Sequence, residues 1–196
     1  MGCICPPKEE PLEILNRALK NVLSQININK TKIENRDKTI KDLDNQINQL
    51  ENDLKQNQYS YSDTEKKQKA RQIMGLKKEL LLEEKGLEEA RTYNETLNNN
   101  KTTIESKIAE IKNMETIGQA NETLAKLRGI ETKNAEILQR NVEKIIEEQM
   151  KREQLIEIMK KGNDAFYDNL GFKNEEDYLK KLLGSNGNTG GAPVFY

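Results

Sequence analysis

The sequence predicts an all-α protein, built as a long antiparallel helical hairpin followed by shorter helices and a flexible C-terminal tail. Three observations lead to this fold class. Apolar residues make up 34% of the 196 residues and charged residues 33%, which is too little apolar matter for a thick globular core but enough for long helices with a narrow apolar face. Apolar residues recur at steps of three and four over two long stretches. A short polar segment with a helix-capping pattern separates these stretches.

The first long helix is expected from Leu12 to Leu54, where the apolar residues keep one heptad register. Only Asn29 and Arg36 interrupt it, and polar residues at such positions can fix the register of packed helices at some loss of stability. The apolar heptad positions of the two long helices form what we call the hairpin seam. Its main members are Leu19, Val22, Ile26, Ile33, Ile40, Leu43, Ile47, Leu50, Leu80, Leu87, Leu97 and Ile104.

A short turn is expected between Gln56 and Ser62, where the heptad pattern stops. Ser62 and Glu65 have the spacing of a capping box, which starts a new helix. A turn this short sends the second helix back along the first, so the hairpin should be antiparallel and cover residues 12–111. The apolar spacing resumes from Ile73 to Ile111, with polar interruptions at Glu83, Asn94 and Lys101.

Shorter helices are expected over residues 114–161, completing a helical core of residues 12–161. The register slips near Gly118 and Gly129, which predicts that the rod bends or breaks into a short helix there, over about 114–127. A further helix should end at Lys161, before a glycine. Its apolar face is predicted to contain Leu138, Val142, Ile145, Ile156 and Met159, with Gln149 and Arg152 at the centre.

Residues 162–183 are expected to form a linker and a short C-terminal helix. Asn174 can cap this helix, the first turn is acidic, and Lys180 and Lys181 precede Gly184, all of which agree with the helix dipole. A helix of about nine residues is marginal in isolation, so it should be ordered mainly when docked on another surface. Residues 184–196 are rich in Gly, Asn and Ser and are expected to be a flexible tail.

Residues 1–11 suggest a lipid-anchored segment. Removal of Met1 would expose Gly2 for myristoylation, and Cys3 and Cys5 stand where a second acyl chain could be added. One myristoyl chain binds membranes only marginally, with an association constant of about 10⁴ M⁻¹, so two chains are needed for a durable anchor. Pro6 stands where the myristoylation pattern has Ser or Thr, and the alternative is that both cysteines are free thiols.

The composition argues against catalysis and against several partner classes. Histidine is absent and Cys3 and Cys5 are the only cysteines, so we expect no metal site, no cofactor and no enzyme activity. A formal net charge of −1 gives no field that would attract nucleic acid. The longest purely apolar run is Leu80 to Leu82, and no secretory signal is present, so we expect a cytoplasmic chain.

With these segments placed, the chain resembles the charged multivesicular body protein family, the ESCRT-III membrane-remodelling subunits, over about residues 10–183. The segment Met114–Leu127 is similar to the family's short third helix, which also contains a glycine and small residues. The acylated amino terminus is most similar to the family's myristoylated subunit. Further similar positions are Ala70, Arg71, Ile73, Met74, Lys77 and Lys78 early in the second helix, and Ile130, Glu131, Ala135, Glu136, Ile137, Leu138, Glu147, Glu148 and Ile158 in the fourth.

The resemblance implies a non-catalytic subunit that assembles with other ESCRT-III subunits into filaments on endosomal membranes, for multivesicular body sorting and vesicle budding and scission. It implies an upstream ESCRT sorting complex that starts assembly, and an AAA ATPase that removes subunits by binding a carboxy-terminal helix. The candidate ATPase-binding residues are Glu176, Leu179, Leu182 and Leu183. A helix that only packs on the hairpin would have the same pattern. The alternative function is a lipid-anchored coiled-coil tether or scaffold, which would form a permanent parallel dimer.

Overall fold

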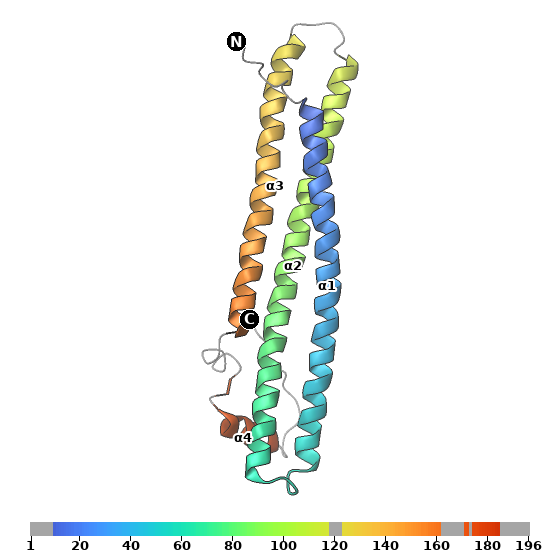
Figure 1. Cartoon of the computed structure of the whole chain (residues 1–196). Coiled ribbons are helices and arrows are strands. Elements are labelled where there is room, and N and C mark those ends of the chain that lie inside the picture. Colours follow the sequence, from blue (N-terminus) through green and yellow to red (C-terminus); the bar gives the residue numbers. More distant parts are fainter. Residues whose placement is uncertain (1–9, 118–122, 162–170, 173, 185–196) are drawn as a thin grey trace, which may run out of the picture. The chain divides into compact units, whose positions relative to one another are not determined.

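The computed structural model describes residues 10–117, 123–161, 171–172 and 174–184. Four helices follow one another along the chain, α1 (Pro11–Gln56), α2 (Asp63–Ile117), α3 (Thr123–Lys161) and α4 (Glu175–Gly184) (Figure 1). No strand occurs in these residues. The predicted all-α class is confirmed, and α1 and α2 form the predicted long helical hairpin. The expected flexible tail and acylated segment lie outside the described residues.

The chain divides into two compact units, and three of the helices contribute to both. The first unit consists of Met1–Glu34 with Glu88–Leu155. The second unit consists of Asn35–Leu87 with Ile156–Tyr196. The second unit therefore contains the hairpin turn and α4.

The core of the first unit is formed by α1, α2 and α3 together. Leu15 and Val22 from α1, Leu97 and Ile104 from α2, and Val142 from α3 are among its most deeply buried side chains. Burying each such side chain stabilises the fold by roughly 1.5–3 kcal/mol relative to leaving it in water. The heptad spacing thus buries one stripe of each helix in a shared core.

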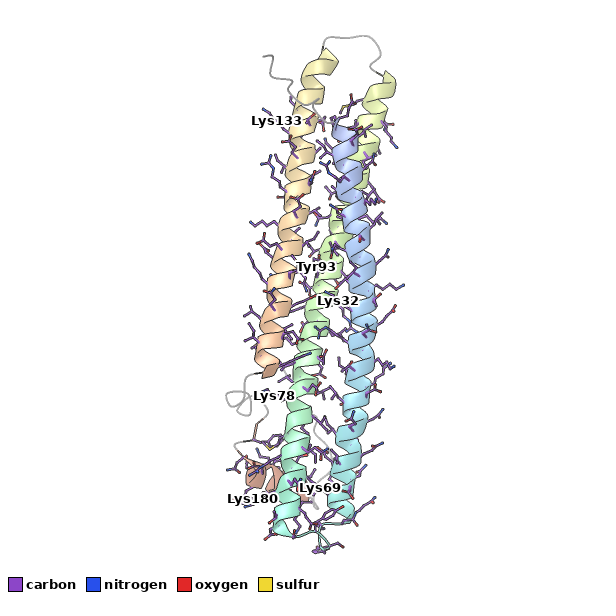
Figure 2. All side chains as sticks on the ribbon, in the orientation of Figure 1. Lys32, Lys69, Lys78, Tyr93, Lys133 and Lys180 are labelled. Atoms are coloured by element: carbon purple, nitrogen blue, oxygen red, sulfur yellow. The ribbon has the colours of Figure 1, made fainter. Side chains whose placement is uncertain are left out.

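The core of the first unit also contains the polar side chains of Asn29 and Tyr93. The buried Asn29 side chain donates a hydrogen bond of 2.7 Å from Nδ2 to the carbonyl oxygen of Ala90. Tyr93 of α2 is buried, and burial together with the negative charge of Glu153 raises its pKa to about 12 (Figure 2). Lys32 of α1 pairs with Glu153 of α3 at 2.7 Å. These pairings fix how the three helices align.

The inward face of α3 differs from the predicted face. Val142 and Ile156 are buried as expected, and Gln149 is buried with them, but Met159 is 39% exposed and Arg152 is exposed. Glu153 and Lys160 take the inward positions instead, because each meets an opposite charge on another helix. Leucine, isoleucine and methionine occur on several faces of α3, so apolar spacing alone selected the wrong positions near its end.

The helix boundaries after the hairpin also differ from those expected. α2 continues to Ile117, and α3 runs without a break from Thr123 to Lys161. A separate short helix over 114–127 is therefore not formed, because residues 114–117 belong to α2 and residues 123–127 to α3, while 118–122, where a bend was the alternative, lie outside the described residues. Gly129 lies inside α3 with no atom within 4 Å of where a Cβ would stand, and a glycine there lowers helix stability by only about 1 kcal/mol relative to alanine.

The second unit has its own core next to the turn. It contains Ile47 and Leu54 of α1, Ile73 and Met74 of α2, and Tyr178 of α4. Across both units the hairpin seam faces inward. Val22, Leu43, Ile47, Leu87, Leu97 and Ile104 are buried, and Leu19, Ile26, Ile33, Ile40, Leu50 and Leu80 are partly buried.

Candidate functional site at the hairpin turn

The turn between α1 and α2 is organised by the carboxylate of Asp53. It accepts hydrogen bonds from the Tyr61 hydroxyl at 2.9 Å, from Asn57 Nδ2 at 2.9 Å and from Lys69 Nζ at 2.7 Å. The bonds from Lys69 and Tyr61 lower the pKa of Asp53. Lys69 Nζ also lies 4.8 Å from the centre of the Tyr61 ring. One acidic side chain near the end of α1 therefore holds both the turn and the first turns of α2.

The predicted capping box is present at the start of α2. The backbone N–H of Ser62 donates to Glu65 Oε2 at 2.8 Å, and the N–H of Glu65 donates to Ser62 Oγ at 3.3 Å. The Ser62 hydroxyl also donates to Glu65 Oε2 at 2.7 Å, and this bond together with the bond from the Ser62 N–H lowers the pKa of Glu65. The cap explains why the chain turns at the position that the sequence indicated, since it satisfies free N–H groups of a new helix.

The short helix α4 is docked beside this turn through Tyr178. The Tyr178 side chain is 2% exposed and packs in the core with Leu50, Ile73 and Leu80. The Phe172 ring meets it edge-on, with ring centres 4.9 Å apart. The predicted cap of α4 is also present, because Asn174 Oδ1 accepts a 2.9 Å hydrogen bond from the N–H of Asp177. Docking explains how a ten-residue helix is ordered here.

A carboxylate on α1 receives the polar end of Tyr178. The Tyr178 hydroxyl donates to Glu51 Oε1 at 2.8 Å, and Lys77 Nζ lies 2.8 Å from the same oxygen. Burial alone would raise the pKa of Glu51, but the bonds from Lys77 and Tyr178 outweigh it and lower that pKa. Burial and the Glu51 acceptor both raise the pKa of Tyr178 above its usual range. Glu51 therefore stays ionised at neutral pH and fixes the position of α4.

Two ion pairs orient the first turn of α4 on α2. Lys67 pairs with Glu176 at 2.7 Å, and Arg71 pairs with Glu175 at 2.5 Å. Each pair has one strongly exposed partner, with the Glu176 side chain 61% and the Arg71 side chain 70% exposed. Exposed pairs contribute little stability, so these contacts guide the docking that the buried Tyr178 stabilises.

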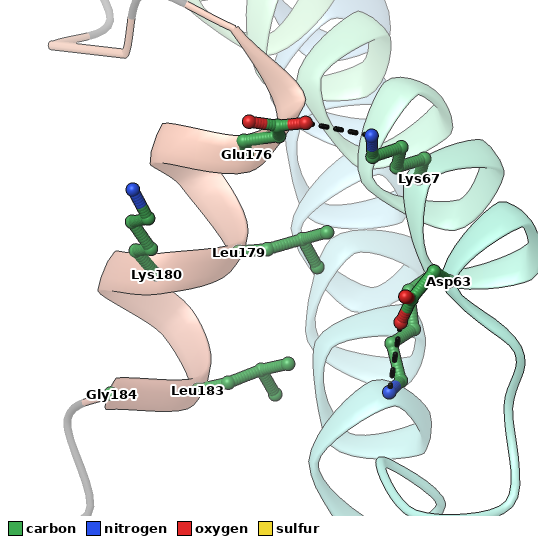
Figure 3. Close-up of a pocket in the computed structure, with 8 residues that line it drawn as sticks. Asp63, Lys67, Glu176, Leu179, Lys180, Leu183 and Gly184 are labelled. Carbon is green, nitrogen blue, oxygen red and sulfur yellow. Dashed lines mark hydrogen bonds and ion pairs between the residues drawn. The ribbon is translucent and has the colours of Figure 1, made fainter.

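The four candidate ATPase-binding residues all lie at this site. Glu176 is held by Lys67, and Leu179 and Leu182 are partly buried against the core of the second unit. Leu183 is partly buried and lines a groove of about 580 Å³ between α4 and the start of α2 (Figure 3). The groove is lined by Asp63, Lys66, Lys67, Glu176, Leu179, Lys180, Leu183 and Gly184. The alternative that this helix packs on the hairpin thus describes the arrangement seen.

A second polar cluster lies farther along the same unit. Glu83 of α2 is 6% exposed and pairs with Arg36 of α1 at 2.5 Å and with Lys160 of α3. Burial alone would raise the pKa of Glu83, but the two cations outweigh it and lower that pKa. Arg36 and Glu83 were both interruptions of the apolar pattern, and the structure brings them together. The cluster joins three helices through one carboxylate.

Gly86 makes room for this cluster, and Gly75 offers a matched comparison on the same helix. A Cβ at position 86 would overlap the Arg36 guanidinium, whereas nothing lies within 4 Å of a Cβ at position 75. We expect Gly75→Ala to raise the free energy of unfolding by about 0.5–1 kcal/mol, because alanine favours helix. Gly86→Ala should instead lower it by about 1 kcal/mol, because the displaced Arg36 loses a hydrogen bond to a charged group. Urea unfolding of both variants measures this, and equal gains for both would contradict it.

The anchor residues Gly2, Cys3 and Cys5 lie outside the described residues. Within the described part of the chain, no group of three or more His, Cys, Asp or Glu side chains is placed to hold a metal ion. None of the helices in the same part of the chain contains an apolar stretch long enough to cross a membrane.

Several residues of the site were not identified from the sequence. Tyr178, Glu51 and Phe172 carry the docking of α4 and were not singled out, and Lys77 was named only for its similarity to the family. The spacing of Tyr178, Leu179 and Leu182 places them on one face of a helix, and that signal could have found Tyr178. Nothing local to Glu51 indicates its role, because its partners are far away in the sequence.

No protein-family model, curated protein or solved structure matches this chain. What the site can do must therefore be argued from its own residues.

Proposed function

We propose that this chain is a non-catalytic membrane-remodelling subunit of the ESCRT-III type. It would assemble with related subunits into filaments on the cytoplasmic face of endosomal membranes, for multivesicular body sorting and vesicle budding and scission. The observation that carries the proposal is the long α1–α2 hairpin together with the short helix α4, which packs against the hairpin beside its turn. The sequence resemblance described above supports it.

The packing of α3 suits a subunit that exchanges contacts within the chain for contacts with neighbours. Inside the first unit, α3 meets α1 and α2 partly through ion pairs, Lys32 with Glu153 at 2.7 Å and Lys107 with Glu131 at 3.0 Å. Charged groups are readily rehydrated, so separating such an interface costs less than separating a fully apolar one. The outer side of α3 in this unit also exposes Ile130, Ile137 and Met150. Such side chains can contact neighbouring subunits.

The proposal assigns roles to the segments that the sequence singled out. Acyl chains on Gly2, Cys3 or Cys5 would concentrate the protein on the membrane, so that weak lateral contacts suffice for assembly. Contacts that repeat head to tail without closing would produce a filament. An upstream ESCRT sorting complex would supply the starting site, and an AAA ATPase would take hold of α4 once it leaves the hairpin.

The membrane test uses a variant that cannot be acylated, with Gly2→Ala, Cys3→Ser and Cys5→Ser together. Expressed in a eukaryotic cell, this variant should stay in the supernatant when membranes are pelleted, because a nearly neutral chain gains little from anionic lipid. The control is Ile4→Ala, which alters the same segment but keeps every acylation position. Equal pelleting of the two variants would show that the anchor is not lipid and would defeat this part of the proposal.

A tether or scaffold is the alternative function, and oligomeric state distinguishes it. In a parallel dimer, the apolar seam residues of one chain would pack against those of a second chain. Here the seam residues of α1 and α2 pack against each other within one chain. The proposal predicts a monomer near 22.6 kDa by light scattering in the absence of membrane. A dimer that persists on dilution favours the tether.

A further inference from the structure

The groove between α4 and the start of α2 presents an open apolar surface with a rim of paired charges, Lys66 with Asp63 and Lys67 with Glu176. Leu179 and Leu183 project into it from α4, and Glu176 and Lys180 flank them along the same helix (Figure 3). Lys66 and Lys67 line it from α2. Its volume of about 580 Å³ falls within the usual range for sites that bind small molecules.

We propose that this groove binds the segment Ala192–Tyr196 of the same chain. The first reason is position. Gly184, the last described residue, itself lines the groove, so the following residues leave from its edge. Residues 185–191 are rich in Gly, Asn and Ser, and such a segment has a root-mean-square reach of roughly 15 Å. Ala192–Tyr196 can therefore return to the groove without strain.

The second reason is chemical complementarity. Ala192–Tyr196 has no charged side chain, and Val194, Phe195 and Tyr196 lose exposed apolar area when they meet Leu179 and Leu183. Aromatic faces also attract nearby ammonium groups. The second unit already uses this contact, with Lys77 5.4 Å from the Tyr178 ring centre and Lys181 5.0 Å from that of Phe172. Lys66 and Lys67 on the groove rim are ion-paired with Asp63 and Glu176, and such a lysine can still contact a ring, as Lys77 contacts Tyr178 while paired with Glu51.

The third reason is tethering. A segment joined to the site by a short linker rich in Gly, Asn and Ser has an effective concentration in the millimolar range, so weak contacts suffice for it to occupy the groove. Pro193 restricts the backbone of the segment and reduces the entropy that binding removes. A free partner of similar composition would have to bind much more tightly to compete.

This inference does not depend on the proposed function, but it has a consequence there. Bound in the groove, the segment covers the groove-facing sides of Leu179 and Leu183, which are two of the candidate ATPase-binding residues. It would then limit access to α4 while α4 is docked. Loss of the segment would expose this face without releasing Tyr178 from the core.

Methyl NMR of the full chain tests the inference. In the wild type, the methyl groups of Leu179 and Leu183 should carry ring-current shifts from Phe195 and Tyr196. The variant Phe195→Ala with Tyr196→Ala should move both sets of resonances, and the Leu97 methyl groups, in the other unit, should not move. The control Asn186→Ala with Asn188→Ala alters the same part of the chain, keeps both rings, and should leave all of these resonances in place.

Two results would overturn the inference. Identical Leu179 and Leu183 resonances in the wild type and in the variant without rings would show that the groove does not bind the segment. Ring-current shifts that disappear on dilution, with contacts between labelled and unlabelled molecules in a mixed sample, would show that the occupant comes from a second copy. Shifts independent of concentration, lost only in the variant without rings, are the result we expect.

Discussion

Tyr178→Ala is expected to release α4 from the hairpin. The substitution removes a side chain that is 2% exposed, and cavities left by large aromatic residues typically cost about 3–5 kcal/mol. It also removes the donor to Glu51 and the ring that Phe172 contacts. Because a ten-residue helix is marginal alone, undocked α4 should unfold locally. Hydrogen exchange should show the amides of α4 losing protection, while those of α1 and α2 away from the turn keep theirs.

Two further variants show which part of Tyr178 is responsible. Tyr178→Phe keeps the ring and loses only the hydrogen bond to Glu51, which is worth about 1.5–3 kcal/mol for a bond to a charged group. Its effect should fall between wild type and Tyr178→Ala. Tyr59→Ala is the matched control, since Tyr59 lies in the nearby turn and is 92% exposed. Unchanged protection of α4 in Tyr178→Ala would mean that the surface ion pairs and the partly buried Leu179 and Leu182 hold the helix without Tyr178.

The hairpin could be predicted because its determinants are local. Ser62 and Glu65 form a cap with each other, and the heptad spacing needs no knowledge of the partner helix. Asn174 likewise caps α4 through a residue three positions away. In each case the interacting groups are neighbours in the sequence, so the pattern is sufficient.

The polar contacts between helices could be anticipated only in part. Arg36 and Glu83 stood out as interruptions of the seam, but nothing in the sequence says that they meet, or that Lys160 joins them. On α3, the choice between Met159 and Lys160 for the inward position depends on Glu83, a residue 77 positions away from Lys160. The roles of Glu51 and Tyr178 depend on a separation of 127 positions for the same reason. Pairing across such distances is set by how the helices align.

Glu83→Ala is expected to have the largest effect among charge substitutions. It leaves Arg36 and Lys160 facing each other without the carboxylate between them, and loss of one partner from a buried ion pair costs about 3–5 kcal/mol. The side chains of Arg36 and Lys160 are 18% and 25% exposed, so water can reach them and reduce the cost to about 2–3 kcal/mol. Urea unfolding at neutral pH measures the loss.

The matched control is Glu84→Ala, one position along α2. Glu84 is exposed, and burial and the nearby charge of Asp44 raise its pKa, so its removal should be neutral or slightly stabilising. A third variant replaces the whole cluster by Arg36→Met, Glu83→Leu and Lys160→Met. Apolar replacement of a complete buried cluster is often neutral or stabilising, so this variant should recover most of the stability that Glu83→Ala loses.

The dependence on pH separates a charge effect from a packing effect. The pKa of Glu83 is lowered below its ordinary value of 4.5 in the folded chain, so its ionised form stabilises the fold above pH 4.5. That stabilisation is lost as the pH falls through the lowered value, because the folded and unfolded chains then both bind the proton. The stability difference between wild type and Glu83→Ala should therefore be full at neutral pH and shrink in acid. A difference that stays constant down to strongly acidic pH would show that Glu83 acts by filling space, and the three-helix charge cluster would lose its assigned role.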